Sequence, residues 1–264
     1  MTAENLLIIA FDGLEATLVE KWNLTNLLQT FHGTYPVESE KYATPALWSA
    51  FITGLHPSSF EAKFVERNVP GVLRRLAFLE IIKKLGRLVF KPHPFSVKDR
   101  YETIFEKVQP SLPYNVFSYN EEPTQFKLRL KYSIPETIGN RNKCLEACRE
   151  WMRLATELAE KFVHLLKSVD WKIAMTHFYF TDIIGHLHPP MMRKAYLKAD
   201  RIARLLRSSV DSETMILIVS DHGMRRGIHT EYGFYSSNIV LDTKPADITD
   251  FYSLILKWTR ERHV

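Results

Sequence analysis

Six residues with carboxylate or imidazole side chains come shortly after three apolar runs of the sequence, the last of them in the loop that follows the third run. They are Asp12, Asp182, His186, Asp221, His222 and His229. A mixed set of this kind suits Zn²⁺, with Mn²⁺ or Fe²⁺ as alternatives, and has too many nitrogen donors for Ca²⁺. Because Asp182 and His186 stand four residues apart, a helical turn would aim both side chains the same way. The sequence therefore favours a divalent metal site assembled from distant segments.

The apolar runs that precede these residues are typical of strands buried on both faces of a parallel sheet. They cover residues 6–11, 171–179 and 214–220. In open α/β sheets, ligands bind at the carboxyl ends of the strands. We therefore expect the carboxylates and imidazoles to converge on one edge of the sheet.

Thr44 is a candidate nucleophile at the same edge. The pair Thr44-Pro45 predicts the start of a helix over residues 46–53, with Thr44 as its N-cap and Pro45 in the first helical position, and Gly54 ends it. The hydroxyl of Thr44 would then lie at the positive end of a helix, where an anion is favoured.

Strands and helices alternate over the rest of the chain. We expect further helices over residues 14–22, 24–31, 142–168, 190–207 and 248–260, and short strands over 34–37 and 239–241. This order predicts an α/β fold with a doubly wound, mostly parallel central sheet, helices on both faces and a helical cap insert. Residues 1–57 and 141–264 would form the metal-binding core, and residues 58–140 a basic cap insert.

The basic character of the chain is concentrated in the predicted insert. The whole chain has a net charge of +5, whereas residues 58–143 alone carry 16 Lys and Arg against 9 Asp and Glu. The amphipathic stretch 72–91 predicts a basic helix that packs on the core or on a dimer partner. Alternatively, it receives an anionic lipid or nucleotide, or touches a membrane surface. Aromatic residues are not interleaved with these charges, so we expect no nucleic-acid partner.

Cysteine content and hydropathy favour a cytoplasmic protein. The two cysteines, Cys144 and Cys148, stand four residues apart in an expected helix, which excludes a disulfide framework and favours reduced, packed thiols. The sequence contains no apolar run of transmembrane length, and the run at residues 6–11 is too short for a signal peptide. We therefore expect the mature chain to begin near Met1.

Five motifs in this order resemble the alkaline phosphatase superfamily, in particular its branch of type I phosphodiesterases and nucleotide pyrophosphatases. They are IAFDG at 9–13, TPALWSAFITG at 44–54, TDIIGH at 181–186, SDHGM at 220–224, and His229 before YGF at 232–234. The resemblance implies two divalent ions. One would be held by Asp182, His186 and His229, and the other by Asp12, Asp221, His222 and the Thr44 oxygen.

The resemblance also implies a chemistry, in which the Thr44 oxygen attacks phosphorus and forms a phosphothreonine that water then hydrolyses. The chain is accordingly predicted to be a metal-dependent phosphoric ester hydrolase, of the phosphodiesterase or nucleotide pyrophosphatase type. The alternatives are a phosphomonoesterase or phosphotransferase on the same two-metal site, or a non-catalytic anion-binding protein with a vestigial site. The substrate would be a small phosphoester, such as a nucleotide or a lipid headgroup. Lys63 and Arg67 are weak candidates for binding it, because the loop after Gly54 departs from the family pattern.

Overall fold

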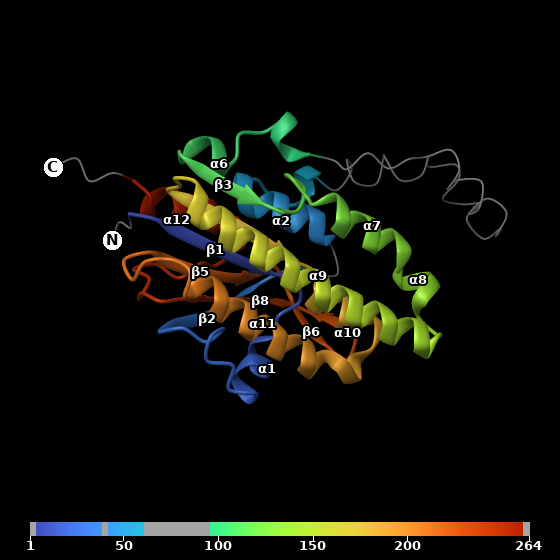
Figure 1. Ribbon diagram of the computed structural model, residues 1–264. Coiled ribbons are helices and arrows are strands. Elements are labelled where there is room, and N and C mark those ends of the chain that lie inside the picture. The colour runs from blue at the N-terminus through green and yellow to red at the C-terminus, as the bar shows by residue number, and fades with distance from the viewer. Residues whose placement is uncertain (1–3, 39–41, 61–95, 261–264) are drawn as a thin grey trace.

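Six strands form the central sheet of the computed structural model, which describes residues 4–38, 42–60 and 96–260 (Figure 1). In spatial order they are β2 (Phe31–Pro36), β8 (Tyr232–Ser237), β5 (Met215–Ser220), β1 (Leu6–Phe11), β4 (Ile173–Phe178) and β3 (Ser111–Tyr114). Four neighbours, β5, β1, β4 and β3, run parallel, whereas β8 is antiparallel to both β5 and β2. The sheet is therefore mixed, with a parallel centre.

The three central strands confirm the prediction from the apolar runs. Every residue of β1, β4 and β5 is buried, as expected for strands that helices cover on both faces. Phe11, the last residue of β1, pairs with Phe178 of β4 and with Ser220 of β5. Because the three strands end level with one another, the residues that follow them begin at the same edge of the sheet.

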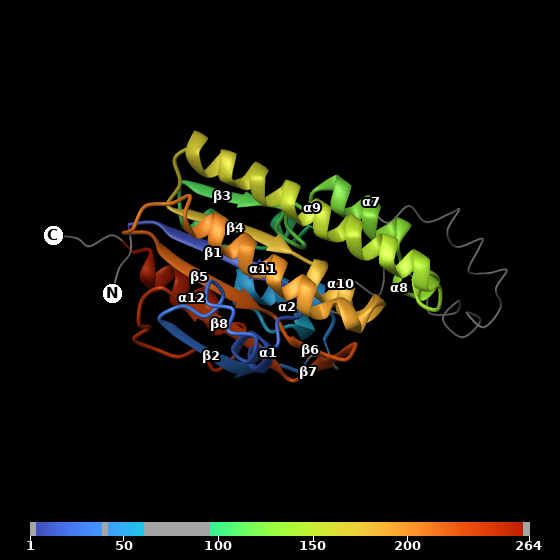
Figure 2. The same cartoon turned by 60° about the horizontal axis from the view of Figure 1, so that its bottom comes forward.

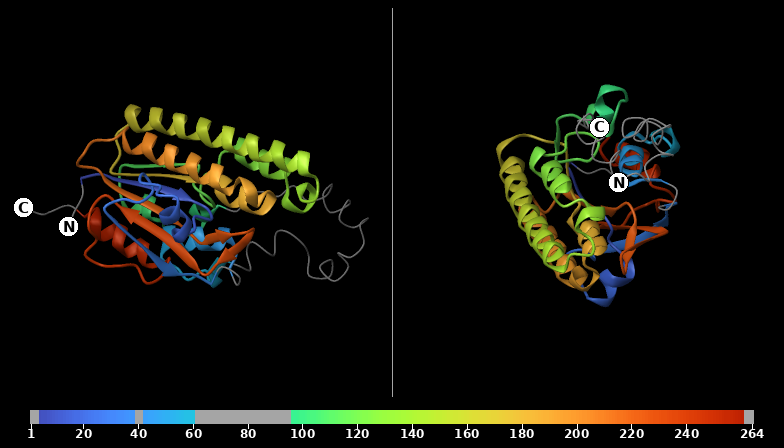
Figure 3. Two further views of the ribbon diagram at one scale, coloured as in Figure 1. Left: turned by 90° about the horizontal axis from the view of Figure 1, so that it is seen from below. Right: turned by 90° about the vertical axis from the view of Figure 1, so that its right-hand side faces the viewer.

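Helices cover both faces of this sheet, which confirms the expected α/β architecture (Figures 2 and 3). On one face α9 (Arg141–Ser168), α10 (Phe180–Leu187) and α11 (Met192–Arg207) pack together, and on the other α2 (Thr44–Thr53), α6 (Ile104–Lys107) and α12 (Asp250–Trp258) do so. The remaining elements are α1 (Ala16–Lys21), η1 (Val97–Asp99), α7 (Pro123–Lys131), α8 (Ile134–Thr137), η2 (Pro189–Met191), β6 (Gly223–Arg225) and β7 (Ile228–Thr230). Among the described residues, no helix combines the length and apolar character needed to cross a membrane.

Two of the local predictions are wrong. Residues 24–30 form turns and bends instead of a helix, and Phe31 already belongs to β2. The backbone N–H groups of Asn26 and Leu27 donate to the carboxylate of Asp200 at 2.9 and 3.2 Å. Residues 239–241 are not a strand, because the preceding strand β8 ends at Ser237. The side chain of Asn238 accepts from the N–H of Ile216 at 2.7 Å and so takes the place of the next strand residue.

The predicted insert contributes to the sheet. Its strand β3 pairs in parallel with β4, so the expectation that residues 58–140 lie outside the sheet is wrong for residues 111–114. The Pro in this short edge strand conceals it from sequence patterns. The basic helix expected over 72–91 lies outside the described residues, and the division into core and insert stays a prediction.

A buried histidine in β4 predicts how the free energy of unfolding depends on pH. His177 of β4 is fully buried, with its ring centroid 4.4 Å from that of Trp48 and 4.5 Å from that of Tyr179. Burial lowers the pKa of His177 to about 4, although nearby Asp12 opposes the shift. In the unfolded chain the ring titrates near its ordinary pKa of about 6.5.

We therefore expect the free energy of unfolding to fall as the pH drops from about 6.5 to 4, because over that range only the unfolded chain gains this proton. The full loss from His177 is about 3 kcal/mol. Denaturant titrations at several pH values should show that His177→Phe flattens this slope, whereas His164→Gln, on the exposed side of α9, leaves it unchanged. Equal slopes in parent and His177→Phe would contradict the assignment.

Candidate metal centre

The level ends of β1, β4 and β5 bring together residues from distant parts of the sequence. Asp12 follows β1, Asp221-His222 follows β5, and Asp182 lies in the first turn of α10 after β4. The N–H of Asp12 donates to the carbonyl of Phe178 at 3.0 Å, which ties the two strand ends. Gly13 has φ +74°, and a Cβ there would come within 3.1 Å of Asp182. Glycine at position 13 therefore permits the close approach of α10.

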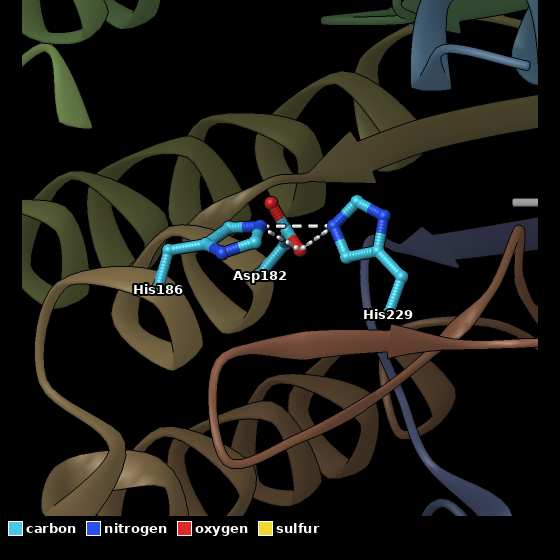
Figure 4. A group of neighbouring side chains, drawn as sticks. All are labelled: Asp182, His186 and His229. Carbon is cyan, nitrogen blue, oxygen red and sulfur yellow. Dashed lines mark hydrogen bonds and ion pairs between the residues drawn. The ribbon is translucent and has the colours of Figure 1, made fainter. Parts of the chain in front are cut away.

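One group of possible ligands consists of Asp182, His186 and His229. Figure 4 shows both imidazoles directed at the carboxylate. Oδ1 of Asp182 lies 3.3 Å from Nε2 of His186 and 3.2 Å from Nε2 of His229, and the two nitrogens are 2.9 Å apart. The three atoms surround a single point, as a metal ion would require. Asp182 and His186 share a face of α10, as their spacing predicts.

A second group joins the first through Asp182. Nε2 of His222 lies 3.1 Å from Oδ1 of Asp12, 4.0 Å from Oδ1 of Asp182 and 3.6 Å from Oδ2 of Asp221. The ring of His222 also stacks on that of His229, with centroids 3.8 Å apart. We call these six residues, Asp12, Asp182, His186, Asp221, His222 and His229, the acid–histidine cluster. The sequence expectation assigned Asp182 to one ion only, whereas its carboxylate lies between the two groups.

The acid–histidine cluster has buried polar atoms that the protein itself does not satisfy. Oδ1 of Asp12, Oδ1 of Asp182, both carboxylate oxygens of Asp221 and Nε2 of His222 are buried, and among the described residues no polar contact outside the cluster satisfies them. Buried polar atoms without partners are costly, and charged ones more so. Carboxylate oxygens and imidazole nitrogens that converge without other partners fit a divalent cation.

The pKa shifts within the cluster indicate crowded negative charge. Burial and the neighbouring charge of Asp12 raise the pKa of Asp221 well above its usual value. Burial alone would lower the pKa of His222, but the carboxylates of Asp221 and Asp12 outweigh it and raise that pKa. Burial would likewise raise the pKa of Asp182, but hydrogen bonds from His186 and His229 hold it below its usual range. The protein therefore attracts positive charge to this point.

Glu15 fixes the hairpin that carries His229, and the sequence analysis missed it. Oε2 of Glu15 accepts from the hydroxyl of Thr230 at 2.8 Å, and Oε1 accepts from Nη2 of Arg225 at 3.1 Å. A Cβ at Gly223 would lie 2.4 Å from Glu15, so the hairpin packs directly on this carboxylate. Glu15 is buried although it stands at the start of α1, where an acid is ordinarily a solvent-exposed cap. No sequence signal distinguishes these two roles.

Thr44 lies at the start of α2, as its first helical residue. Ala43 is the N-cap, which corrects the expected register by one position. The first turn is held in place by Ser118, whose hydroxyl donates to the carbonyl of Pro45 at 3.3 Å. No hydrogen bond or ion pair among the described residues joins Thr44 to the acid–histidine cluster. Lys63 and Arg67 lie outside the described residues, so their predicted role stays a prediction.

Comparisons with known proteins identify the family of the chain. The family profile of type I phosphodiesterase / nucleotide pyrophosphatase matches residues 93–253, more than half of the chain. This match confirms the resemblance stated from the motifs. GPI ethanolamine phosphate transferase 3 of Saccharomyces cerevisiae is 30% identical over 64 residues, which are 23% of this chain and only 6% of that protein.

Solved structures share the fold at low sequence identity. The PH0037 protein of Pyrococcus horikoshii superposes with a TM-score of 0.51 and 16% identity, over 100% of each chain. Alkaline phosphatase from the Antarctic bacterium TAB5 gives a TM-score of 0.49 and 12% identity, over 98% of this chain and 99% of that one.

The helical spacing predicts that His186, and not His188, contributes to metal binding. His188 is the C-cap of α10 and belongs to neither ligand group. We expect His186→Ala to weaken the binding of divalent metal by more than about tenfold, because it removes one of three converging donors. Titration of metal-stripped protein with Zn²⁺ measures this effect, and His188→Ala is the matched control. Loss of affinity in His188→Ala but not in His186→Ala would overturn the assignment.

The contacts of Glu15 predict an effect on the metal centre without direct coordination. We expect Glu15→Gln to weaken Zn²⁺ binding by about 10- to 100-fold, because the hairpin that orients His229 loses its charged anchor. Glu20→Gln, an equal change on the exposed side of α1, serves as control. A Zn²⁺ affinity that is the same in all three proteins would show that Glu15 does not position His229.

Proposed function

We propose that this chain, which belongs to the type I phosphodiesterase / nucleotide pyrophosphatase family, hydrolyses phosphate diesters at the acid–histidine cluster. Family membership supports a phosphoester hydrolase or transferase. The observation that carries the proposal is the convergence of buried carboxylate and imidazole atoms, which among the described residues contact one another and no other polar group that would satisfy them. Substrates of this class are small phosphoesters, such as nucleotides or lipid headgroups.

Two divalent ions fit the donor set, with Zn²⁺ as the first choice and Mn²⁺ or Fe²⁺ as alternatives. Asp182, His186 and His229 would hold one, and Asp12, Asp221, His222 and the Thr44 oxygen the other. When bound, such ions act as Lewis acids and stabilise negative charge on phosphoryl oxygens. The cluster residues serve to hold this charge in a fixed position, since buried, partnered side chains do not need to reorganise during the reaction.

Thr44 is the proposed nucleophile. Its hydroxyl oxygen forms a bond to phosphorus and loses its proton, while the bond from phosphorus to the leaving oxygen breaks and that oxygen gains a proton. Water then attacks the phosphothreonine and restores the free hydroxyl. The location of Thr44 in the first turn of α2 supports this role, because free N–H groups and the helix dipole at a helix start favour a phosphate.

A phosphotransferase is the second candidate. In that reaction the phosphothreonine passes its phosphoryl group to an alcohol instead of water, with no change at the cluster. The partial likeness to GPI ethanolamine phosphate transferase 3 supports this alternative. Product analysis with an added alcohol acceptor separates the two reactions.

Replacing Thr44 tests the nucleophile, and adding a chelator tests the metal requirement. With nitrophenyl diester and monoester substrates, we expect Thr44→Ala to lose at least about 10³-fold in kcat, because the covalent route is closed. Thr44→Ser keeps a measurable rate, since its oxygen remains. Chelator abolishes the activity of the parent, and metal restores it.

Covalent trapping checks the same step by a different measurement. Acid quenching during turnover, followed by peptide mass analysis, should find phosphate on Thr44 with the monoester and nitrophenyl phosphate with the diester. The same groups should appear on the serine of Thr44→Ser. The matched control is Thr53→Ala, at the far end of α2, which should retain full labelling of Thr44. Near-parental turnover by Thr44→Ala would show that water attacks phosphorus directly. No turnover of either ester by metal-loaded parent would contradict the proposed function itself.

A further inference from the structure

A cavity lies beside the hairpin that carries His229. It measures about 780 Å³ and is formed by α1, the segment 189–193 and the hairpin residues Arg225 and Arg226. Figures 1 and 2 show α1 and the β6–β7 hairpin side by side. A cavity of this volume accommodates a small organic ligand.

The charges around this cavity are of one sign. Four of its lining residues are cationic, namely Lys21, Arg193, Arg225 and Arg226, and none of the described lining residues is acidic. Arg225 is paired with Glu15, whereas Lys21, Arg193 and Arg226 have no ion pair among the residues that the structure describes. Three exposed cations around a concave surface attract a ligand with more than one negative charge.

The apolar side of the cavity is rigid. Trp22 lines it and packs edge-on against the buried Tyr196, with ring centroids 5.1 Å apart. The hydroxyl of Tyr196 accepts from the N–H of Glu15 at 2.7 Å and donates to the carbonyl of Gly13 at 2.8 Å. Trp22 is thus held against the main chain that follows Asp12. An aromatic wall in a fixed position suits a ring or an apolar group attached to the anion.

The turn of the hairpin has Arg226 at a position with positive φ, where Asn or Gly is less strained. Arg225 pairs with Ile228, so Arg226 and Gly227 form a two-residue turn with φ +50° and +82°. Such a turn favours Asn or Gly at its first position, and a side chain like that of Arg is strained there. The turn therefore presents a cation to the cavity at a cost in local stability.

We propose that this cavity binds a phosphate monoester dianion whose apolar substituent lies against Trp22. Arg193, Arg226 and Lys21 surround the phosphate, and no bond is made or broken. The proposal does not depend on hydrolysis at the acid–histidine cluster, because the cavity residues and the cluster residues are different. The phosphate can come from a soluble ester or from the headgroup of an anionic lipid.

Binding to metal-stripped protein tests the proposal, because the acid–histidine cluster then holds no metal ion that could bind the phosphate. By calorimetry we expect phenyl phosphate to bind more tightly than inorganic phosphate, and Trp22→Leu to remove that preference. The double variant Arg193→Gln/Arg226→Asn should lose at least about tenfold in affinity for phenyl phosphate. Asn suits the left-handed turn position, so the hairpin keeps its shape in this variant.

The matched control is Arg201→Gln/Arg204→Gln, which removes the same charge from exposed positions of α11 outside the cavity. It should bind phenyl phosphate as the parent does. Cosedimentation with neutral vesicles doped with phosphatidic acid distinguishes the sources. If the parent and the control bind these vesicles and Arg193→Gln/Arg226→Asn does not, the ligand is a lipid headgroup. If the parent binds phenyl phosphate but not the vesicles, the ligand is a soluble ester. Absence of phenyl phosphate binding, or an equal loss in both double variants, overturns the proposal.

Discussion

Three buried carboxylates at neighbouring strand ends are the constraint on which the rest of the site depends. Asp12, Asp182 and Asp221 are all buried, and a buried charge costs several kcal/mol unless partners compensate it. The imidazoles of His222 and His229 compensate part of this charge, but they cannot satisfy every carboxylate. The pKa of Asp182 is lowered because His186 and His229 stabilise its charged form, whereas the pKa of Asp221 is raised by burial and by the charge of Asp12. The imidazoles therefore stabilise one carboxylate and leave another destabilised. Divalent cations relieve both acids at once, which is why the cluster fits metal ions better than protons.

The apolar centre of the sheet makes this arrangement possible. Each residue of β1, β4 and β5 is buried, so the strands cannot slip or fray without exposing apolar surface, and their ends stay level. The residues of the acid–histidine cluster lie just beyond the regular strands, on turns, a short helix and the β6–β7 hairpin. Close contacts fix these turns, such as the hydrogen bond from Thr181 to the carbonyl of Asp12. Rigidity therefore comes from the sheet, and the directions of the ligands come from the segments that follow it.

Sequence patterns could predict the site residues that follow the apolar strands β1, β4 and β5. They could predict little of the segments that surround those residues. A buried parallel strand has a continuous apolar run, so its end, and a candidate ligand such as Asp12, can be located from the sequence. Strand β8 has no such pattern, because its residues YGFYSS pack through aromatic rings and hydroxyls whose partners lie elsewhere in the chain. The role of Glu15 is also not predictable, since it depends on contacts with residues more than 200 positions away. Local periodicity carries no information on such contacts.

The β6–β7 hairpin separates two charged environments by the alternation of its side chains. Met224 pairs with His229 across the hairpin, and Arg225 pairs with Ile228, so these two pairs lie on opposite faces. Met224 is fully buried, whereas the side chain of Arg225 is 55% exposed. A cation on the same face as His229 would repel metal ions from the acid–histidine cluster. The pleat instead directs Arg225 outward, where Glu15 neutralises it. One short hairpin can therefore carry a residue of the acid–histidine cluster on one face and a cation on the other, provided that its register does not shift.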